Sequence, residues 1–207
     1  TQETTQDAAA RMVAEGAERV VLLNFASARN PGGGFIKGAK AQEEDLSRCS
    51  GLYPCLMGQD EYYHNNRQQR SLLYTDYMIY SPDVPFIKVQ HDQYLEQPFL
   101  ASVITAPAPN AGAVRRQQQS SVNDIIPALH RRVGKVLAIA RAQGHRNLVL
   151  GAWGCGVFAN DPVMVATAFL EWLQSDGFAG AFDRVVFAVH DSTKDRRVLQ
   201  AFANVLG

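Results

Sequence analysis

Three consecutive glycines at residues 32–34 constrain this chain more than any other feature of the sequence. They follow Pro31 and a short continuous apolar run at residues 19–25, which is typical of a central strand covered on both faces. The chain therefore leaves a strand, turns, and then offers backbone amides that no side chain blocks. Because ligands of open α/β sheets gather beyond the carboxyl ends of strands, we expect something flat or anionic to bind here.

An acidic segment at residues 42–45 follows this loop and begins a stretch of helical periodicity. Leu46, Cys49, Tyr53 and Leu56 repeat at helical spacing, which predicts a helix with the acidic residues in its first turn. Acidic residues are common there simply because they complement the helix dipole, and a glycine is commonly only a turn residue. A triple glycine is costly in backbone entropy, however, so the combination favours one shared site for the loop and the carboxylates.

Two ordered motifs resemble those of a known enzyme family. The three glycines, the spacer at residues 35–41 and the sequence Gln-Glu-Glu resemble the signature of poly(ADP-ribose) glycohydrolases, specifically the compact bacterial type built on a macrodomain. Residues 151–162, GAWGCGVFANDP, are similar to the diphosphate-binding loop of that family. Weaker similarities lie at residues 105–110 and 185–191, so the resemblance covers most of the chain.

The resemblance implies hydrolysis of the ribose-to-ribose O-glycosidic bonds of poly(ADP-ribose), with release of ADP-ribose and reversal of ADP-ribosylation, as in the DNA damage response. Glu44 would be the general acid and base, and Glu43 would fix the ribose of the substrate. The expected partners are the polymer, ADP-ribose and ADP-ribosylated carrier proteins, and no metal or cofactor is expected. The residues expected to bind substrate are Asn30, Gly32, Gly33, Gly34, Gln42, Gly154, Cys155, Gly156, Val157 and Phe158.

Each loop is expected to hold a different part of the substrate. The amides of residues 154–159 would hold the diphosphate, and the glycine loop would let the terminal ribose approach closely. Asn30 would bind the ribose hydroxyls, with Ser27 as the alternative, because the register before the glycines is open. Phe158 is either a ring that lies on a ribose or base, or ordinary core filling, and the resemblance favours ligand contact.

Other classes of protein fit these motifs less well. A non-catalytic reader of ADP-ribose needs the diphosphate loop but not paired glutamates, so the Gln-Glu-Glu sequence favours hydrolysis. Residues 154–159 also match the loose GxGxxG/A pattern of dinucleotide-binding proteins, but the next helix, at Asp161 and Pro162, starts too late. A P-loop is excluded because Ala39 and Lys40 follow Gly38 where Lys-Ser or Lys-Thr is required.

Two further candidates for chemistry are more plausibly structural. Cys155 sits between glycines, but a nucleophile elbow requires glycine where Trp153 stands, so we favour packing. His190 and Asp191 could ligate a metal at a strand end, yet a structural histidine is favoured. The other histidines show no ligand spacing: His64, His91, His130 and His145.

Composition and periodicity predict one domain over residues 1–207, with the first few residues partly disordered. Helices are predicted at 5–16, 59–70, 123–143, 162–173 and 195–205, and strands at 19–25, 77–80, 86–89, 99–105, 146–150 and 184–189. The helix at 59–70 is assigned a solvated face and no chemistry, and the segment 115–121 is expected to be mobile. The helix at 123–143 carries an apolar stripe that begins at Ile126. Arg115 and Arg116 could attract phosphates, although a solvated loop is favoured. This alternation predicts an α/β fold, and the resemblance makes it a three-layer α/β/α macrodomain-like sandwich with a central mixed sheet.

Charge and cysteine content bound the partners and the location. The 20 basic and 20 acidic residues cancel, so there is no global field to gather nucleic acid. No apolar run approaches the roughly 18 residues needed to cross a bilayer, so no membrane association is expected. The 3 cysteines are odd in number and lack metal-ligand spacing, which predicts free thiols and a cytoplasmic protein.

Overall fold

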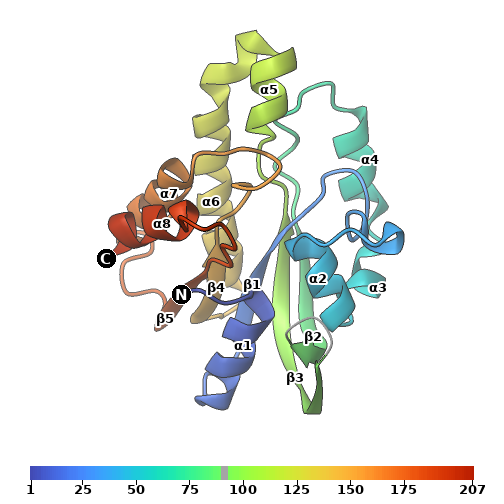
Figure 1. The fold of residues 1–207 in the computed structure, drawn as a ribbon, viewed down its shortest axis with the longest axis vertical. Coiled ribbons are helices and arrows are strands. Elements are labelled where there is room, and N and C mark those ends of the chain that lie inside the picture. The colour runs from blue at the N-terminus through green and yellow to red at the C-terminus, as the bar shows by residue number, and fades with distance from the viewer. Residues whose placement is uncertain (90–92) are drawn as a thin grey trace.

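A mixed β-sheet lies at the centre of the molecule and helices cover it on both sides (Figure 1). The structure is a computed structural model and describes residues 1–89 and 93–207. Its elements are α1 (Thr5–Ala14), β1 (Val20–Phe25), η1 (Phe35–Lys37), α2 (Gln42–Cys49), α3 (Leu52–Leu56), α4 (Asp60–Gln68), β2 (Ile79–Val89), β3 (Gln93–Ala106), α5 (Ala111–Gln117), η2 (Gln119–Asp124), α6 (Ile125–Ala142), β4 (Asn147–Gly151), α7 (Pro162–Gln174), β5 (Arg184–Ala188) and α8 (Arg197–Leu206). The described strands pair in the order β2-β3-β1-β4-β5. Only the β2 and β3 pair is antiparallel, whereas β1 runs parallel to both β3 and β4, and β4 to β5.

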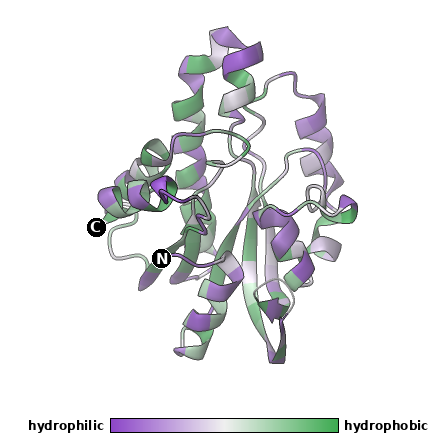
Figure 2. Cartoon of the chain, in the orientation of Figure 1, coloured by the Kyte–Doolittle hydropathy of each residue, from purple (hydrophilic) through white to green (hydrophobic). Residues whose placement is uncertain are grey.

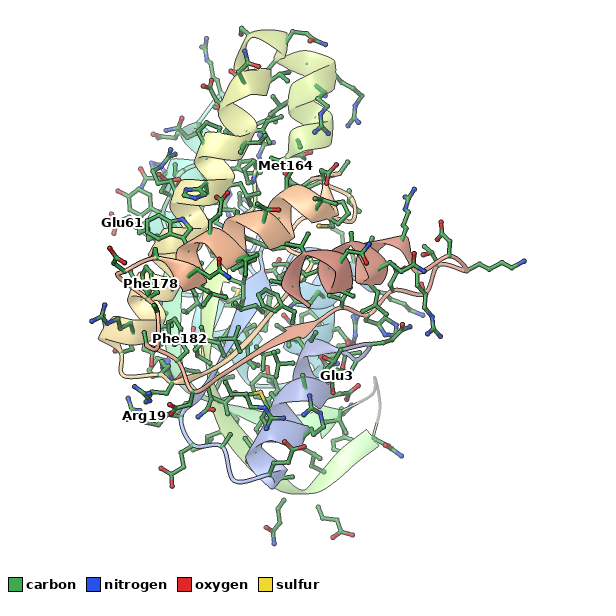
Figure 3. All side chains as sticks on the ribbon, turned by 90° about the vertical axis from the view of Figure 1, so that its left-hand side faces the viewer. Glu3, Arg19, Glu61, Met164, Phe178 and Phe182 are labelled. Carbon is green, nitrogen blue, oxygen red and sulfur yellow. The ribbon has the colours of Figure 1, made fainter. Side chains whose placement is uncertain are left out.

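Alternate residues of β1 face two separate hydrophobic cores. Val20 and Leu22 pack in the core shared with α1, α2, α3 and α4, whereas Val21 and Leu23 pack in the core shared with α6, α7 and α8. Figure 2 shows hydrophobic residues concentrated on the central strands, and Figure 3 looks onto α7 and α8, which cover the sheet on one side. The three-layer α/β/α sandwich with a mixed central sheet is therefore confirmed.

The parallel strands β1, β3 and β4 all end at the same end of the sheet, so the three loops that follow them lie together. Phe25 at the end of β1 pairs with Ala106 at the end of β3, and β4 ends at Gly151 beside them. The glycine loop follows β1 and the second motif follows β4, so both emerge at the carboxyl ends of adjacent strands (Figure 1). The topology thus places the two sequence motifs side by side.

The helix predicted through Leu56 is interrupted at Ser50, so that prediction is wrong. Ser50 is extended, with φ −148° and ψ 176°, and forms a β-bridge with Phe86 of the edge strand. Its hydroxyl accepts a hydrogen bond from Leu52 N at 3.1 Å and starts α3. The apolar residues keep a helical spacing across this break because α2 and α3 both pack against the same core.

The two strands predicted at 77–80 and 86–89 are one strand, β2, in the structure. Pro82 and Pro85 suggested a break, but β2 is an edge strand, where a missing N–H is tolerated. The pairing register shifts between Ser81 and Val84, which accommodates this irregular segment. The first few residues, which we expected to be partly disordered, lie along the other edge, where Val189 N donates to the carbonyl of Thr1 at 2.9 Å.

Residues 115–117 end α5 and residues 119–121 begin η2, which corrects the prediction of a loop at this segment. The side chain of Asn110 accepts a hydrogen bond from Ala113 N at 3.0 Å and caps α5. Gln118 then binds the backbone of a neighbouring loop through Leu72 N at 2.9 Å. The stripe of α6 also starts one residue earlier than predicted, because Ile125 is buried whereas Ile126 is 48% exposed. None of the helices within the described ranges is long and apolar enough to cross a membrane.

Candidate active site

A cavity of about 1000 Å³ opens where the loops after β1 and β4 meet. It contains residues from both sequence motifs, so the two motifs form one site. The predicted site residues that line it are Asn30, Gly33, Gly34, Gln42, Glu43, Glu44, Gly154, Gly156, Val157 and Phe158. Gly32 and Cys155 are not among its lining residues, although their neighbours are.

Gly33 lies directly against the two glutamates. It adopts φ 59°, a left-handed conformation that favours glycine. A Cβ atom at this position would overlap Oε1 of Glu44 and lie 3.0 Å from Oε2 of Glu43. The glycine loop and the paired carboxylates are therefore in direct contact, with no room for a side chain between them.

Glu44 is held by the backbone of the loop that precedes its helix. It is 8% exposed, and its Oε1 accepts a hydrogen bond from Gly34 N at 2.7 Å. Its Oε2 accepts a second hydrogen bond from Ala41 N at 3.1 Å, in the manner of the glutamate in a helix capping box. Its carboxylate is thus fixed at the wall of the cavity by two amides, which is the preorganisation that proton transfer requires.

Glu43 is more deeply buried than Glu44 and points toward β1. It is 3% exposed and accepts hydrogen bonds from Ser27 N at 2.6 Å and from Nδ2 of Asn24 at 3.3 Å. Burial raises the pKa of Glu43 to about 8, and the charge of Glu44 adds to the rise, although the hydrogen bonds from Ser27 and Asn24 oppose it. The raised pKa favours the protonated form of Glu43 near neutral pH.

Gln42 ties the start of α2 to the central strand. Its Oε1 accepts a hydrogen bond from Phe25 N at 2.8 Å, and its Nε2 donates to the carbonyl of Leu23 at 2.9 Å. Nε2 also lies 3.0 Å from the hydroxyl oxygen of Thr5. Although Gln42 lines the cavity, its amide is committed to the protein, and its contacts indicate that it orients the two glutamates that follow it.

Both residues weighed for the ribose hydroxyls line the cavity. The hydroxyl oxygen of Ser27 accepts hydrogen bonds from Arg29 N at 3.2 Å and from Asn30 N at 3.1 Å, so it shapes the turn that presents Asn30. Its proton can still be donated to a ligand. Both Asn30 and Ser27 are therefore placed where they can bind ribose hydroxyls.

The second loop is packed tightly at one glycine and open at the next. A Cβ atom at Gly154 would overlap the amide of Asn160 and lie 2.6 Å from Cβ of Ala108. Nδ2 of Asn160 donates to the carbonyl of Pro109 at 2.9 Å and so joins this loop to the segment after β3. Gly156, by contrast, has open space around its Cβ position. Backbone next to an open glycine is suited to a diphosphate.

Cys155 lies on the other side of this loop, in a second cavity of about 470 Å³. Burial raises the pKa of the Cys155 thiol to about 12, which is the reverse of what a nucleophilic thiolate requires. The two cavities share the lining residues Phe25, Ala41, Gln42, Ala152 and Gly156, so they adjoin across this loop and the start of α2.

Asp191 has a structural role at the start of α8. It accepts hydrogen bonds from the hydroxyl of Thr193 at 2.6 Å and from Val198 N at 2.9 Å. These bonds, the Thr193 hydroxyl first, lower the pKa of Asp191 to about 2. No group of three potential metal ligands occurs among the residues that the structure describes, and His91 lies outside them.

Phe158 lies between the cavity and the core. It lines the large cavity and also packs against the core below α6 and α7. Its carbonyl accepts a hydrogen bond from Gly112 N at 2.8 Å, and its ring lies 6.0 Å from the ring of Tyr74 between centroids. An aromatic side chain thus stands at the cavity wall with its own packing partner behind it.

Sequence reasoning missed the contribution of α4, which was assigned no chemistry. Tyr62 and Tyr63 are buried against the sheet, and Asn66, one turn further on, is buried as well. The spacing of these three residues marks an inward face that the polar composition hid. Among the cavity residues that we did not predict, the larger side chains of this side of the site are Ile36, Lys37, Tyr53, Leu56, Met57, Asp60, Tyr63 and Arg67.

Comparison with known proteins identifies the family. The model of the microbial-type PARG catalytic domain matches residues 1–89. The crystal structure of poly(ADP-ribose) glycohydrolase from Deinococcus radiodurans in complex with ADP-ribose is 48% identical to this chain and superposes with a TM-score of 0.94, covering 100% of this chain and 82% of that one. The chain belongs to the bacterial poly(ADP-ribose) glycohydrolase family.

Another bacterial poly(ADP-ribose) glycohydrolase, from Thermomonospora curvata and bound to the inhibitor ADP-HPD, gives a similar result. It is 48% identical, with a TM-score of 0.93 over 99% of this chain and 77% of that chain. A mutant of the same enzyme is 47% identical, with the same TM-score and coverage. No curated protein sequence gave a match. Membership of this glycohydrolase family also confirms the macrodomain-like fold.

Proposed function

We propose that residues 1–207 act as a single poly(ADP-ribose) glycohydrolase domain in which Glu44 is the general acid and base. The observation that carries the proposal is the contact of Glu44 with the glycine loop, opposite a second loop suited to a diphosphate. A pure reader of ADP-ribose needs no proton donor at this position. The 3 free cysteines support a reducing, cytoplasmic location, which we also propose.

Cleavage requires a proton for the leaving oxygen and then an activated water molecule. Each oxygen of Glu44 accepts one backbone N–H and retains a second lone pair. One of these lone pairs can carry the proton that is given to the glycosidic oxygen, which departs as a ribose hydroxyl when its bond to the anomeric carbon breaks. The same oxygen then takes a proton from the water that attacks the anomeric carbon, so a single residue serves both steps.

Glu43 assists by holding the terminal ribose and by remaining neutral. Its proton removes a negative charge that would otherwise repel the diphosphate of the substrate. It also accepts the amide of Ser27 and so fixes the loop that bears Asn30. Loss of Glu43 should therefore affect binding and geometry, whereas loss of Glu44 affects the proton transfers.

The two adjoining cavities fit the two ends of ADP-ribose. With its diphosphate on the loop at residues 154–159, the terminal ribose reaches Glu44 beneath the glycine loop and beside Phe158. The adenosine half then extends into the second cavity, on the far side of Gly156. This placement puts the scissile bond at the mouth of the larger cavity.

Two measurements on the same sample test the function. Free ADP-ribose should bind in calorimetry and raise the melting temperature without added metal. Incubation with poly(ADP-ribose) should release ADP-ribose, followed by chromatography. No stabilisation by millimolar ADP-ribose alongside stabilisation by NAD or ATP would contradict the proposed ligand. Binding of ADP-ribose without any cleavage would instead assign the chain a reader function.

A further inference from the structure

Tyr74 adopts a backbone conformation that non-glycine residues rarely adopt. Its φ is 65°, in the left-handed region, where the Cβ atom of an L-residue is crowded by its own backbone. Residues in this region persist when their surroundings hold them, and they cluster at functional sites. Glycine would remove the strain, so what distinguishes tyrosine here is its side chain.

Arg132 holds one side of this strained residue. Its guanidinium is completely buried, and Nη2 donates to the carbonyls of Leu73 at 2.6 Å and Tyr74 at 2.8 Å. Its other nitrogens donate to Oδ1 of Asp76 at 2.7 Å and to the carbonyl of Pro107 at 3.0 Å. Each of the three nitrogens of this buried charge is thus hydrogen-bonded, and the side chain fixes the loop of Tyr74 to the end of β3.

Asn66 of α4 holds the other side. It is completely buried, and its Oδ1 accepts hydrogen bonds from Thr75 N at 2.9 Å and from the Thr75 hydroxyl at 3.0 Å. Its Nδ2 donates to the carbonyl of Tyr62 at 2.9 Å, which anchors it within its own helix. The backbone on both sides of Tyr74 is therefore fixed by buried side chains from different helices.

The ring of Tyr74 is directed at Phe158, with a tilt of 42° between the two ring planes. The backbone of Phe158 is fixed separately by Gly112, but that bond does not determine where its ring points. We infer that Tyr74 is a positioning residue, whose ring holds Phe158 in place at the wall of the ADP-ribose cavity. This inference rests on the proposed function because it assigns Phe158 to the sugar of the same ligand.

Three substitutions separate the ring of Tyr74 from its backbone strain. Tyr74→Phe keeps the ring, Tyr74→Ala removes the ring and keeps the strain, and Tyr74→Gly removes both. We expect Tyr74→Ala and Tyr74→Gly to weaken ADP-ribose binding by the same factor, about 2–10-fold, as for loss of an aromatic pair. Tyr74→Phe should bind as the parent does, and Tyr74→Gly should melt above Tyr74→Ala because its strain is relieved.

A double-mutant cycle with Phe158→Ala supplies the second readout. If Tyr74 acts through the ring of Phe158, Tyr74→Ala should have no further effect on ADP-ribose affinity once that ring is absent. Affinity that follows melting temperature, with Tyr74→Gly better than Tyr74→Ala, would assign Tyr74 a structural role and overturn the inference. Additive effects in the cycle would overturn it as well. Because the readout is affinity, a parent that binds ADP-ribose without cleaving polymer refutes only the proposed hydrolysis.

Discussion

Replacing Gly33 by alanine displaces both carboxylates of the site without changing either of them. The added methyl group would overlap Oε1 of Glu44 and press on Oε2 of Glu43. To restore an ordinary contact, the Glu44 carboxylate must retreat by about 1 Å. That movement lengthens or breaks its hydrogen bond with Gly34 N, now 2.7 Å.

The size of the effect has two parts. Left-handed backbone costs about 1–2 kcal/mol for alanine, and a hydrogen bond to a charged group contributes about 1.5–3 kcal/mol. Gly33→Ala should therefore lower the free energy of unfolding by about 2.5–5 kcal/mol. A catalytic group misplaced by about 1 Å can lose about 100-fold in rate, so release of ADP-ribose from polymer should fall by about that factor.

Gly38→Ala is the matched control. Gly38 has φ 79°, also left-handed, but a Cβ atom there would meet nothing within 4 Å. It should lose only the backbone part, about 1–2 kcal/mol, and keep the parent rate. Urea unfolding and polymer cleavage are measured on both variants at a temperature where each is folded. Equal cleavage rates for folded Gly33→Ala and Gly38→Ala would refute the argument that the position of Glu44 determines the rate.

Three further predictions concern the glutamates and Phe158. Glu44→Gln should bind ADP-ribose but cleave polymer about 10²–10⁴-fold more slowly in a chromatographic assay, and cleavage at the parent rate would remove Glu44 from the chemistry. The variant should also be less stable, because the NH₂ group of the glutamine must face one of the two backbone N–H groups that now donate to Glu44. Phe158→Ala should lose about 1–3 kcal/mol of ADP-ribose binding in calorimetry, and unchanged binding would leave Phe158 a packing residue. Because the pKa of Glu43 is raised from 4.5 to about 8, the folded state holds a proton that the unfolded chain releases between these pH values. The free energy of unfolding should therefore fall as pH rises through this window, by up to about 1.4 kcal/mol per pH unit. Urea unfolding of Glu43→Gln should lack this part of the pH dependence, and identical pH profiles for the parent and Glu43→Gln would contradict the raised pKa.

The parts of the site that the sequence predicted are those fixed by local rules. The apolar run at β1, the glycines and the acidic first turn of α2 are contiguous in the chain, so their contact follows from one strand, one loop and one helix. The start of α7 at Asp161 and Pro162 was also predictable from adjacent residues and is confirmed. The Asp161 side chain accepts a hydrogen bond from Val163 N at 2.8 Å and caps the helix.

The parts that could not be predicted depend on contacts between distant segments. The break at Ser50 is set by its bridge to Phe86, and the inward face of α4 by packing on the sheet. Arg132, which stands in an otherwise apolar stripe of α6, gave no sign of the four backbone and side-chain oxygens that it binds. Helical periodicity shows which residues are buried together, but it cannot show what they meet.

The hydrogen bonds of the Gln42 side chain couple the start of α2 to the central strand. Its side chain occupies the amide of Phe25 and the carbonyl of Leu23, which are groups of the most central strand. Detaching the start of α2 would leave the amide of Phe25 and the carbonyl of Leu23 without the partner that Gln42 provides, and this cost opposes separate opening of α2. The cavity therefore combines a solvent-exposed rim, where Ile36 and Val157 are 78% and 91% exposed, with a floor at Glu43 and Glu44 that is buried and held against the central strand.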